Sequence, residues 1–386
     1  MVLEKRVAIV GVGQTVFTRK YQGSIRELCF EAFKEAMEDA KLTPREIDAS
    51  IVCSAPEYDK QRTPAGLIAE YLGLNPQPTF LVESICSSST TGIKVAYGFI
   101  SSGLHDVVAV IGFQKMSELT SAEAQERMGR GADIIWEAPF GTMMPAYYAM
   151  YAKYHMEKYG TTEEQLAKVR VKSSKYGALN PKAAFRKQVT VEEVLKSRVV
   201  STPLKVFDCC ANADGASCVI LAGEDKAREI TDTPIWIVGL GSASDAINTA
   251  YRSEFAGLTC TVKAAKVAYE MARVEPKDVN VAEVHDCFTI AEVMAYEDLG
   301  FCPKGQGGRM VEEGQTEIGG KIPVNVDGGL LSKGHPIGAT GGSQVRTIVQ
   351  QLRGEAGNVQ VKNAEIGLVH NVGGVGIYAN VIIFRR

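Results

Sequence analysis

The sequence of 386 residues predicts an α/β protein made of two copies of one unit, each a mostly parallel sheet covered by helices. The first observation is that the apolar run Val-Ala-Ile-Val-Gly-Val-Gly at 7–13 returns as Ile-Trp-Ile-Val-Gly-Leu-Gly at 235–241. The second is that strand and helix patterns alternate after both copies. The third is the length, which exceeds what one hydrophobic core of ordinary size covers.

The two apolar runs predict buried strands that end in glycine turns. Thr43 in the first half and Glu275 in the second each precede a proline and then an acid, which is a helix-start pattern. The next elements predicted are a helix at 24–40 and a strand at 50–53 in the first half, and a helix at 260–272 and a strand at 281–284 in the second.

The third match between the halves is a loop of small residues that leads into a helix. It reads Ser-Ile-Cys-Ser-Ser-Ser-Thr-Thr-Gly at 84–92 and Lys-Gly-His-Pro-Ile-Gly-Ala-Thr-Gly-Gly at 333–342. The closing strands are predicted at 107–111 and 216–221 in the first half and at 366–369 and 376–383 in the second. We therefore predict two domains, 1–228 and 229–386, whose pseudo-twofold relation brings equivalent loops together.

The first half carries an extra polar, helical segment at about 115–205, with a predicted helix at 161–176. Methionine and tyrosine cluster ahead of that helix, at Met143, Met144, Tyr147, Tyr148, Met150 and Tyr151. This cluster favours a helix that faces the core or a second subunit. A lid over a substrate is the alternative interpretation, because long insertions often serve a site.

The composition excludes several functional classes. Lys plus Arg number 42 and Asp plus Glu number 45, for a net charge of −3, so no nucleic-acid partner is expected. The apolar runs are too short to cross a membrane, and the charged residues Glu4, Lys5 and Arg6 disfavour a secretory signal. We expect a cytoplasmic protein with no membrane association.

Nine cysteines without any C-x-x-C spacing indicate neither a disulfide framework nor a zinc ribbon. We expect seven of them to be packing residues. Gly11 and Gly13 suggest a dinucleotide motif, but Val16 replaces its third glycine. Neither a P-loop nor a G-x-S-x-G motif occurs.

Cys86 differs from the other thiols, because it follows a predicted strand and opens a helix of small residues. Free backbone N–H groups and the helix dipole would stabilise its thiolate. His285, His335 and His370 lie at strand ends or helix starts of the second half, where α/β proteins build their sites. His285, Cys287 and Cys302 match no usual zinc spacing, so no metal is expected.

These motifs resemble the thiolase family. Gly-His-Pro-Ile-Gly-Ala-Thr-Gly at 334–341 looks like the G-H-P-x-G-x-[ST]-G motif, and the Cys86 segment looks like the nucleophile motif. The segment at 208–216 is similar to the one before the last strand of the first thiolase half. The resemblance covers nearly the whole chain and implies a five-layered α/β/α/β/α fold with two mostly parallel mixed sheets.

The chain departs from bacterial degradative thiolases at two places. It has His-Asp-Cys-Phe at 285–288 in place of Asn-Glu-Ala-Phe, and His370 in place of a catalytic cysteine. This combination is similar to sterol-carrier-type thiolases and archaeal acetoacetyl-CoA thiolases. There the second catalytic cysteine corresponds to Cys287.

The resemblance implies condensation of two acetyl-CoA to acetoacetyl-CoA and CoA through an acetyl-Cys86 intermediate, for the mevalonate pathway. His335 would take the proton of Cys86, and Cys287 would be the second acid and base. His285 and His335 would form one oxyanion hole, and the N–H groups of Cys86, Gly373 and Gly374 a second. His370 would support Cys86 or Cys287. No prosthetic group is expected, since CoA is the substrate carrier.

Two rival functions remain open. A decarboxylating 3-ketoacyl synthase needs one cysteine and two histidines but no second thiol, and a non-catalytic scaffold subunit needs none of them. A hydroxymethylglutaryl-CoA synthase lacks its glutamate base here. The resemblance also implies a homodimer or homotetramer, and association with hydroxymethylglutaryl-CoA synthase through a small zinc-ribbon/OB-fold protein.

Overall fold

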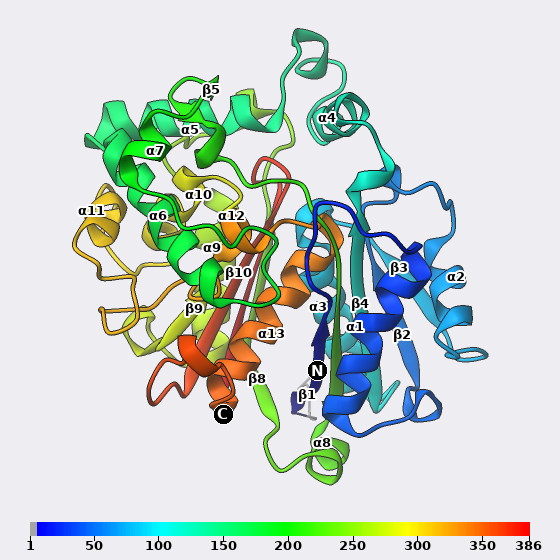
Figure 1. Ribbon diagram of the computed structural model, residues 1–386. Helices are drawn as coiled ribbons and strands as arrows, with labels where there is room; N and C mark the ends of the chain where they lie inside the picture. Colours follow the sequence, from blue (N-terminus) through cyan, green and yellow to red (C-terminus); the bar gives the residue numbers. More distant parts are fainter. Residues whose placement is uncertain (1–5) are drawn as a thin grey trace.

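The computed structural model describes residues 6–386, so Glu4 and Lys5 lie outside the described residues. Its centre is one nine-stranded sheet in the order β3-β2-β4-β7-β1-β8-β11-β10-β9 (Figure 1). The first half supplies β1 (Val7–Gln14), β2 (Ala49–Cys53), β3 (Thr79–Val82), β4 (Val107–Lys115) and β7 (Asp214–Gly223). The second half supplies β8 (Ile235–Ser244), β9 (Val281–Glu283), β10 (Ile366–Gly373) and β11 (Tyr378–Arg385).

The two expected sheets are joined edge to edge, because β1 and β8 pair antiparallel at Ala8–Trp236 and Ile9–Ile235. The mixed α/β class is confirmed, but parallel pairing is rarer than predicted. Among the described neighbouring strands of this sheet, five pairings are antiparallel and three are parallel. A tight hairpin explains the antiparallel pairing of β10 with β11, and β7 runs against β1 and β4.

Side-chain alternation along the strands builds the five layers. In β4, Val108 and Val110 face a central core, whereas Val107, Ala109 and Ile111 face an outer one. Helices α1 (Ile25–Ala40) and α2 (Pro64–Tyr71) cover the outer face of the first half, and α9 (Thr259–Ala272) covers that of the second. Helices α3 (Ser88–Ser101) and α13 (Thr340–Arg353) fill the centre, so both faces of the sheet are buried.

The glycines of the repeated apolar run do not form turns, contrary to the prediction. β1 and β8 continue through them, and a Cβ on Gly13 or Gly241 would collide with the backbone oxygen of Ala32 or Ala264. These glycines therefore let α1 and α9 pack directly on the strand backbone. The same close approach in both halves preserves the repeat.

The helix starts at Thr43 and Glu275 are confirmed as short 3₁₀ turns, Pro44–Glu46 and Pro276–Asp278. Each carries a capping box, in which the acid accepts the N–H of the residue before the proline. Each follows a helix that ends in a left-handed residue, Lys41 (φ 56°) or Arg273 (φ 53°).

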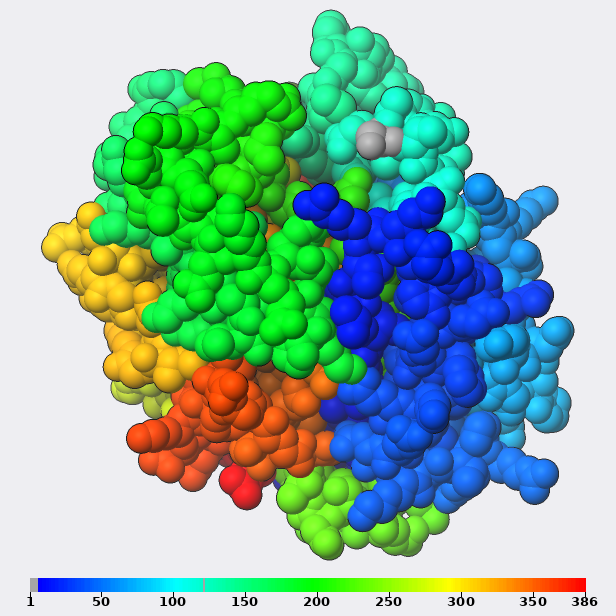
Figure 2. Space-filling view, viewed as in Figure 1, coloured from blue at the N-terminus to red at the C-terminus, as the bar shows by residue number. Residues whose placement is uncertain are grey.

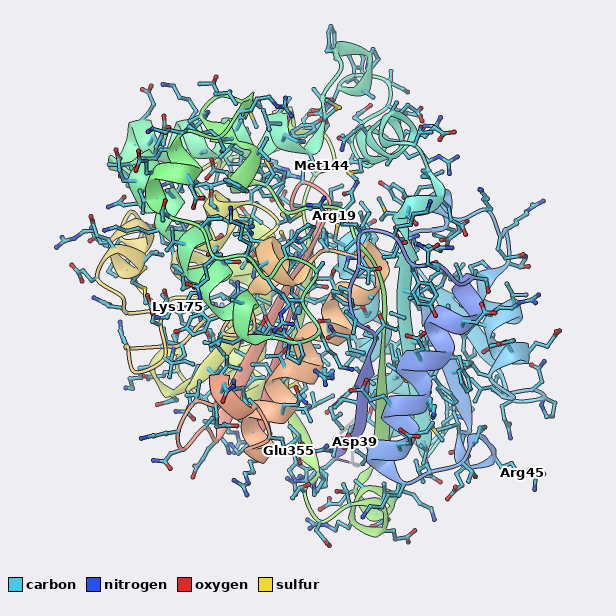
Figure 3. All side chains as sticks on the ribbon, viewed as in Figure 1. Arg19, Asp39, Arg45, Met144, Lys175 and Glu355 are labelled. Atoms are coloured by element: carbon cyan, nitrogen blue, oxygen red, sulfur yellow. The ribbon has the colours of Figure 1, made fainter. Side chains whose placement is uncertain are left out.

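The two small-residue loops meet in the centre, as the repeat predicts. A 3₁₀ turn precedes each central helix, Ile85–Ser87 before α3 and Ile337–Ala339 before α13, and the two turns contact each other. Ser89 Oγ donates to the Gly338 carbonyl oxygen across 2.6 Å. At the other end of α13, Arg353 forms an ion pair with Asp39 of α1 (2.9 Å), which joins the two halves; Asp39 is labelled in Figure 3.

The insert forms α4 (Ser121–Gly129), α5 (Met144–Tyr159), α6 (Glu163–Leu179) and α7 (Val191–Leu195), with a two-stranded sheet of β5 (Val199–Ser201) and β6 (Leu204–Lys205). Figure 2 shows most of it, in green, lying over the second half. The polar sequence around His155 in α5 favours an exposed position for this residue. In the structure it is buried, beside Thr161 and Glu297.

The remaining described helices are α8 (Glu224–Ile230), α10 (Thr289–Asp298), α11 (Gly307–Glu312) and α12 (Gly329–Lys333). The predicted domain boundary between residues 228 and 229 falls inside α8. Across residues 6–386, no helix has the length and apolar character that a bilayer span needs.

Candidate active site

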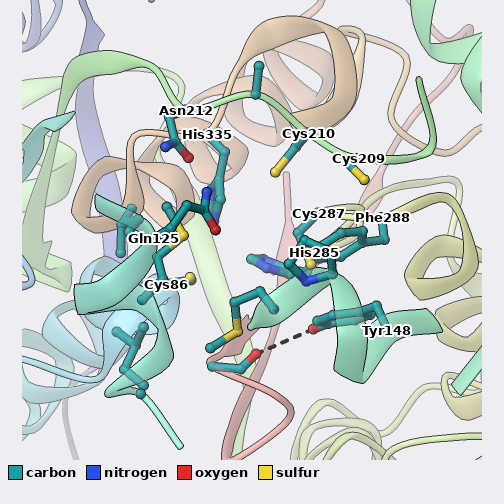
Figure 4. A pocket seen from close by; sticks show the side chains of 18 of the residues that line it. Cys86, Gln125, Tyr148, Cys209, Cys210, Asn212, His285, Cys287, Phe288 and His335 are labelled. Carbon is teal, nitrogen blue, oxygen red and sulfur yellow. Dashed lines mark hydrogen bonds between the residues drawn. The ribbon is translucent and has the colours of Figure 1, made fainter. Parts of the chain in front are cut away.

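A cavity of about 280 Å³ lies where the two halves and the insert meet. Its wall includes Cys86, His285, Cys287 and His335, whose side chains converge in Figure 4. The insert contributes Gln125, Met128, Gly131, Met144, Pro145, Tyr148 and Val200. The structure thus brings together four of the predicted site residues.

Cys86 stands in the 3₁₀ turn ahead of α3, on a constrained backbone. The preceding Ile85 has φ 55°, a left-handed conformation that a β-branched residue rarely adopts. Ser88 holds this turn, since its Oγ donates to the Ile85 carbonyl (2.7 Å) and accepts from the Ser84 N–H (2.9 Å). The serine-rich motif therefore fixes the backbone that presents the thiol.

The Cys86 thiolate is less favoured than the helix position predicts. Burial raises the pKa of the Cys86 thiol to about 12, although hydrogen bonding from the Gly374 backbone opposes this shift. The negative charge of Glu57 raises the pKa further. Cys86 is therefore a thiol at neutral pH and needs a base to remove its proton.

His335 has the hydrogen bonding and the protonation state that a base requires. Its Nδ1 lies 2.7 Å from Thr340 Oγ1, and the Thr340 hydroxyl donates to the Pro336 carbonyl oxygen (2.9 Å). Because the hydroxyl has one hydrogen, Nδ1 must carry the proton that Thr340 accepts. Nε2 then holds a lone pair, and burial lowers the pKa of His335 to about 4, so the ring is neutral at pH 7.

His285 has the opposite tautomer. Asn371 donates from Nδ2 to His285 Nδ1 across 3.0 Å, which leaves the ring proton on Nε2. The single hydrogen of the Thr90 hydroxyl can reach either Asn371 Oδ1 (3.0 Å) or the Ser87 carbonyl oxygen (2.9 Å), and it orients the amide when it donates to Asn371. Burial, reinforced by His335, lowers the pKa of His285 well below its usual range. His285 is therefore a neutral hydrogen-bond donor.

The nucleophile and the two imidazoles lie within reach of one another. One ligand atom each of Cys86, His285 and His335 lies within 4.8 Å of the other two. The two rings meet edge to face, with centroids 5.2 Å apart and planes at 81°. A base and a donor thus flank one thiol, which is the geometry of nucleophilic acyl transfer.

Cys287 follows β9 and reaches the same cavity. The Cys210 N–H donates to the Cys287 carbonyl oxygen (2.9 Å), and this pairing ties the segment before β7 to the second half. Burial raises the pKa of Cys287 well above its usual range, and the Tyr148 hydroxyl is the main opposing influence. A tyrosine of the insert, rather than a histidine, is thus the main group that favours the Cys287 thiolate.

Asp286, which lies between His285 and Cys287 in the sequence, joins this segment to α12 by hydrogen bonds. Its fully buried carboxyl group, whose pKa burial raises to about 8, accepts the N–H of Leu330 (2.7 Å) and of Leu331 (3.3 Å) in α12. Helix α12 leads through Gly334 (φ 107°) to His335. One side chain therefore fixes the strand end that carries His285 and Cys287 relative to the loop that carries His335.

The glycines of the 334–341 motif allow close contacts within the protein. A Cβ on Gly338 would collide with the Phe113 carbonyl oxygen, and one on Gly341 would come 2.7 Å from Thr90 Cγ2. These glycines let the loop press against β4 and α3 of the first half. They thereby bring His335 to Cys86.

Of the two glycines at the β10–β11 hairpin, Gly374 lines the cavity and Gly373 does not. Gly374 (φ 62°) lines the cavity, and its backbone lowers the pKa of Cys86, as an N–H facing the thiol does. Gly373 packs on the Cys86 loop, where a Cβ would collide with the Ser84 carbonyl oxygen. Their roles in an oxyanion hole stay a prediction.

His370 does not line the cavity. Its Nε2 lies 2.9 Å from Thr261 Oγ1 of α9, on the outer side of the sheet. Successive side chains of β10 point to opposite faces, so Asn371 points inward in its place. The predicted contact of His370 with Cys86 or Cys287 is therefore not formed.

Sequence reasoning missed three residues of the site, Asn371, Tyr148 and Asn212. Asn371 directly follows His370 in the predicted motif, and Tyr148 belongs to the Met/Tyr cluster. Asn212 lies in the thiolase-like segment 208–216 and forms a bridge with His335. Cys209 and Cys210 also line the cavity, so fewer than seven cysteines are mere packing residues.

The Met/Tyr cluster combines both interpretations. Tyr147, Tyr148 and Tyr151 are buried, as a core-facing helix requires. Met144, Pro145 and Tyr148 at the start of α5 line the cavity as a cover does, and Tyr148 stacks on Phe288 with centroids 4.4 Å apart. Figure 3 places Met144 where the insert meets the rest of the chain.

Family models match both halves: "Thiolase, N-terminal domain" at residues 7–225 and "Thiolase C-terminal domain-like" at residues 241–386. An acetyl-CoA acetyltransferase of Methanothermobacter thermautotrophicus is 44% identical, over 98% of this chain and 99% of that protein. Sterol carrier protein 2 of Bos taurus is 35% identical, over 96% of this chain and 70% of that protein. A solved structure, "Ltp2-ChsH2(DUF35) aldolase", superposes with a TM-score of 0.86 at 26% identity, covering 100% of this chain and 99% of that one. With two family models that together span most of the chain and a relative at 44% identity, the chain belongs to the thiolase family of acyl-transferring enzymes.

Proposed function

We propose that this protein is an acetyl-CoA C-acetyltransferase, which condenses two acetyl-CoA to acetoacetyl-CoA and CoA. The convergence of Cys86, His285, His335 and Cys287 on one cavity carries the proposal. The acetyl-CoA acetyltransferase of M. thermautotrophicus supports the choice of substrate. CoA enters as the substrate carrier, so the reaction needs no metal or prosthetic group.

The first step transfers an acetyl group to Cys86. His335 Nε2 takes the thiol proton while sulfur attacks the thioester carbon, and the proton then passes to the departing CoA thiolate. The N–H groups of Cys86 and Gly374 would donate to the developing oxyanion, whereas the His285 Nε2–H, with His335 once it is protonated, would donate to the enolate oxygen of the second step. The complementary tautomers of the two histidines support this division of roles.

The second step needs another base, for which we propose Cys287. The neutral His335 would accept the Cys287 proton, and the resulting thiolate would remove an α-proton from the second acetyl-CoA. The carbanion would attack the acetyl-Cys86 carbonyl and expel the Cys86 thiolate, which takes the proton back from His335 as acetoacetyl-CoA forms. The Tyr148 hydroxyl, which donates to the Gly374 carbonyl oxygen (3.3 Å), can turn its hydrogen to the Cys287 thiolate and stabilise it, which supports the assignment.

We place this reaction in the cytoplasm, at the entry to the mevalonate pathway, as the likeness to archaeal relatives implies. We also propose a homodimer or homotetramer that associates with hydroxymethylglutaryl-CoA synthase through a small zinc-ribbon/OB-fold protein. The solved structure "Ltp2-ChsH2(DUF35) aldolase", which joins two named components, supports a second component.

The segment after α4 projects at the top of Figure 1 and carries three strongly exposed side chains, Ile135 (71%), Trp136 (70%) and Phe140 (83%). Such a patch is typical of an interface.

The decisive experiment separates the two thiols. Cys86→Ala should abolish both thiolysis of acetoacetyl-CoA and acetylation of the protein. Cys287→Ala should still accumulate acetyl-Cys86 from acetyl-CoA, visible in intact-mass spectra, but lose condensation. Cys302→Ala, outside the cavity, is the matched control. Normal thiolysis by either cavity variant would refute its assigned role.

A decarboxylating synthase is tested in the same assay. The cavity position of Cys287 favours thiolase chemistry, because decarboxylative condensation needs no second thiol base. Turnover of malonyl-thioester but not of acetyl-CoA would favour the synthase. Absence of any acyl-enzyme with either substrate would favour a non-catalytic scaffold.

A further inference from the structure

We propose that Cys86, His285 and His335 form a binding site for one thiophilic divalent cation of the Zn²⁺ class, which switches the enzyme off. Loss of activity on metal binding rests on the proposed function, whereas binding itself depends only on the three side chains. One sulfur and two imidazole nitrogens are the donors of an open, catalytic-type zinc site, with a fourth position left to water.

The distances are short enough for one ion to bridge the three residues. Zinc bonds of about 2.3 Å to sulfur and 2.0–2.1 Å to nitrogen place tetrahedral ligands about 3.3–3.7 Å apart. The three ligand atoms already lie within 4.8 Å of one another. Closure by about 1 Å lies within the reach of side-chain torsions, so the backbone can stay in place.

His335 is ready to bind. Its Nδ1–H is held by Thr340, so Nε2 presents its lone pair to the cavity. The hydrogen bond at Nδ1 also has the form of the outer support that zinc-bound histidines carry.

His285 must change tautomer to bind through Nε2, and its neighbours allow this. Rotation of the Asn371 amide would turn Oδ1 toward His285 Nδ1, which would then hold the proton. The amide nitrogen would turn toward Thr90 Oγ1, which can accept while it donates to the Ser87 carbonyl oxygen (2.9 Å). The hydrogen bonds of Asn371 with His285 and with Thr90 are thus both kept, with donor and acceptor exchanged.

The surroundings favour a soft cation. Among the described residues that line the cavity there is no lysine or arginine, and the Glu57 carboxylate lies at its wall. Three more thiols, Cys209, Cys210 and Cys287, and two thioethers, Met128 and Met144, line the same space. Sulfur donors select zinc-like ions over magnesium or calcium.

Binding removes both reactive groups at once. The ion replaces the proton of the Cys86 thiol, which is released to water, and it occupies the lone pair of His335 that would have accepted that proton. No oxidant or reductant is involved. The inhibited state is therefore fully reversible by a chelator.

The test uses Co²⁺ as a spectroscopic probe on the metal-free, full-length protein, together with Zn²⁺ competition. We expect one Co²⁺ per chain, with a thiolate-to-cobalt charge-transfer band and the d–d bands of tetrahedral coordination. Zn²⁺ should displace it and abolish thiolysis in the same 1:1 ratio, and a chelator should restore activity. His335→Ala should weaken binding by at least about 100-fold, because the loss of a direct ligand costs more than the 10–100-fold that follows the loss of an outer-shell partner.

Three controls keep the outcome clear. Alkylation of Cys86 in the wild-type protein should abolish the charge-transfer band without any mutation, and Cys302→Ala should keep it. Asn371→Asp should tighten binding by about tenfold, since a carboxylate holds the Nδ1–H tautomer of His285, and should slow thiolysis of the metal-free enzyme. A band that survives Cys86 alkylation, or absence of tetrahedral cobalt, would overturn the proposal. Inactivity of the metal-free enzyme would count against the proposed function alone.

Discussion

Asn371 Nδ2 donates to His285 Nδ1 across 3.0 Å and so decides which nitrogen of that ring carries the proton. Thr340 decides the opposite for His335 through its contact at Nδ1. Two histidines in one cavity thus have different tautomers, which are set by neighbours that do not line the cavity. Hydrogen-bond direction, rather than histidine chemistry, distinguishes the donor from the base.

Asn371→Leu should lower kcat/KM for thiolysis by about 10–100-fold. Without the amide, a fraction of His285 takes the other tautomer and loses the Nε2–H that stabilises the oxyanion. Steady-state kinetics would measure the loss, with the exposed Asn358→Leu as control. Unchanged kinetics would show that His285 keeps its tautomer without help.

The alkylation rate of Cys86 by iodoacetamide should rise about tenfold per pH unit between pH 6 and 9, with no plateau. Cys86 and His335 are both neutral in this range, because burial raises the pKa of the thiol to about 12 and lowers that of the imidazole to about 4. Peptide-level mass spectrometry would give the rates. A plateau near neutral pH would reveal a preformed thiolate–imidazolium pair instead.

Asp286→Ala should reduce kcat by about 10–100-fold, because misplacement of catalytic groups by a fraction of an ångström is costly. The substitution also removes the acceptor of the Leu330 and Leu331 N–H groups. Each N–H left without a partner should lower the free energy of unfolding by about 1–3 kcal/mol, unless a water molecule takes the place of the carboxyl group. Kinetics and urea denaturation would separate the effects. Asp286→Asn should fall between, and the exposed Asp232→Ala should behave as wild type.

His370→Gln should change the pH dependence of stability more than activity. Burial lowers the pKa of His370 to about 3, so between pH 6.5 and that value the unfolded chain binds a proton that the folded chain does not. This residue therefore makes the wild type lose stability as pH falls. Removing it should lessen the loss between pH 6.5 and 5 by about 1–2 kcal/mol.

Urea midpoints of both proteins at several pH values would measure that difference. Thiolysis by His370→Gln should stay within about threefold of wild type, since the ring contacts Thr261 and not the cavity. Parallel stability curves would contradict the titration, and a large loss of activity in a folded variant would restore a catalytic role to His370.

The sequence by itself determined the duplicated α/β fold, because the apolar periodicity and helix-start signals recur in both halves in the same order. It also identified Cys86, His285, His335 and Cys287, since each stands in a motif at the end of an element. Local patterns of this kind are set by neighbours along the chain, and those neighbours are visible in the sequence.

Only the tertiary structure decided how the side chains of the site are arranged and protonated. It showed that the repeated glycines serve helix packing, that Asn371 rather than His370 contacts His285, and that Tyr148 of the insert accompanies Cys287. Protonation states and tautomers depend on burial and on partners that are distant in sequence: 86 residues separate Asn371 from His285. Such contacts arise only when the halves pack, so no single segment of the chain encodes them.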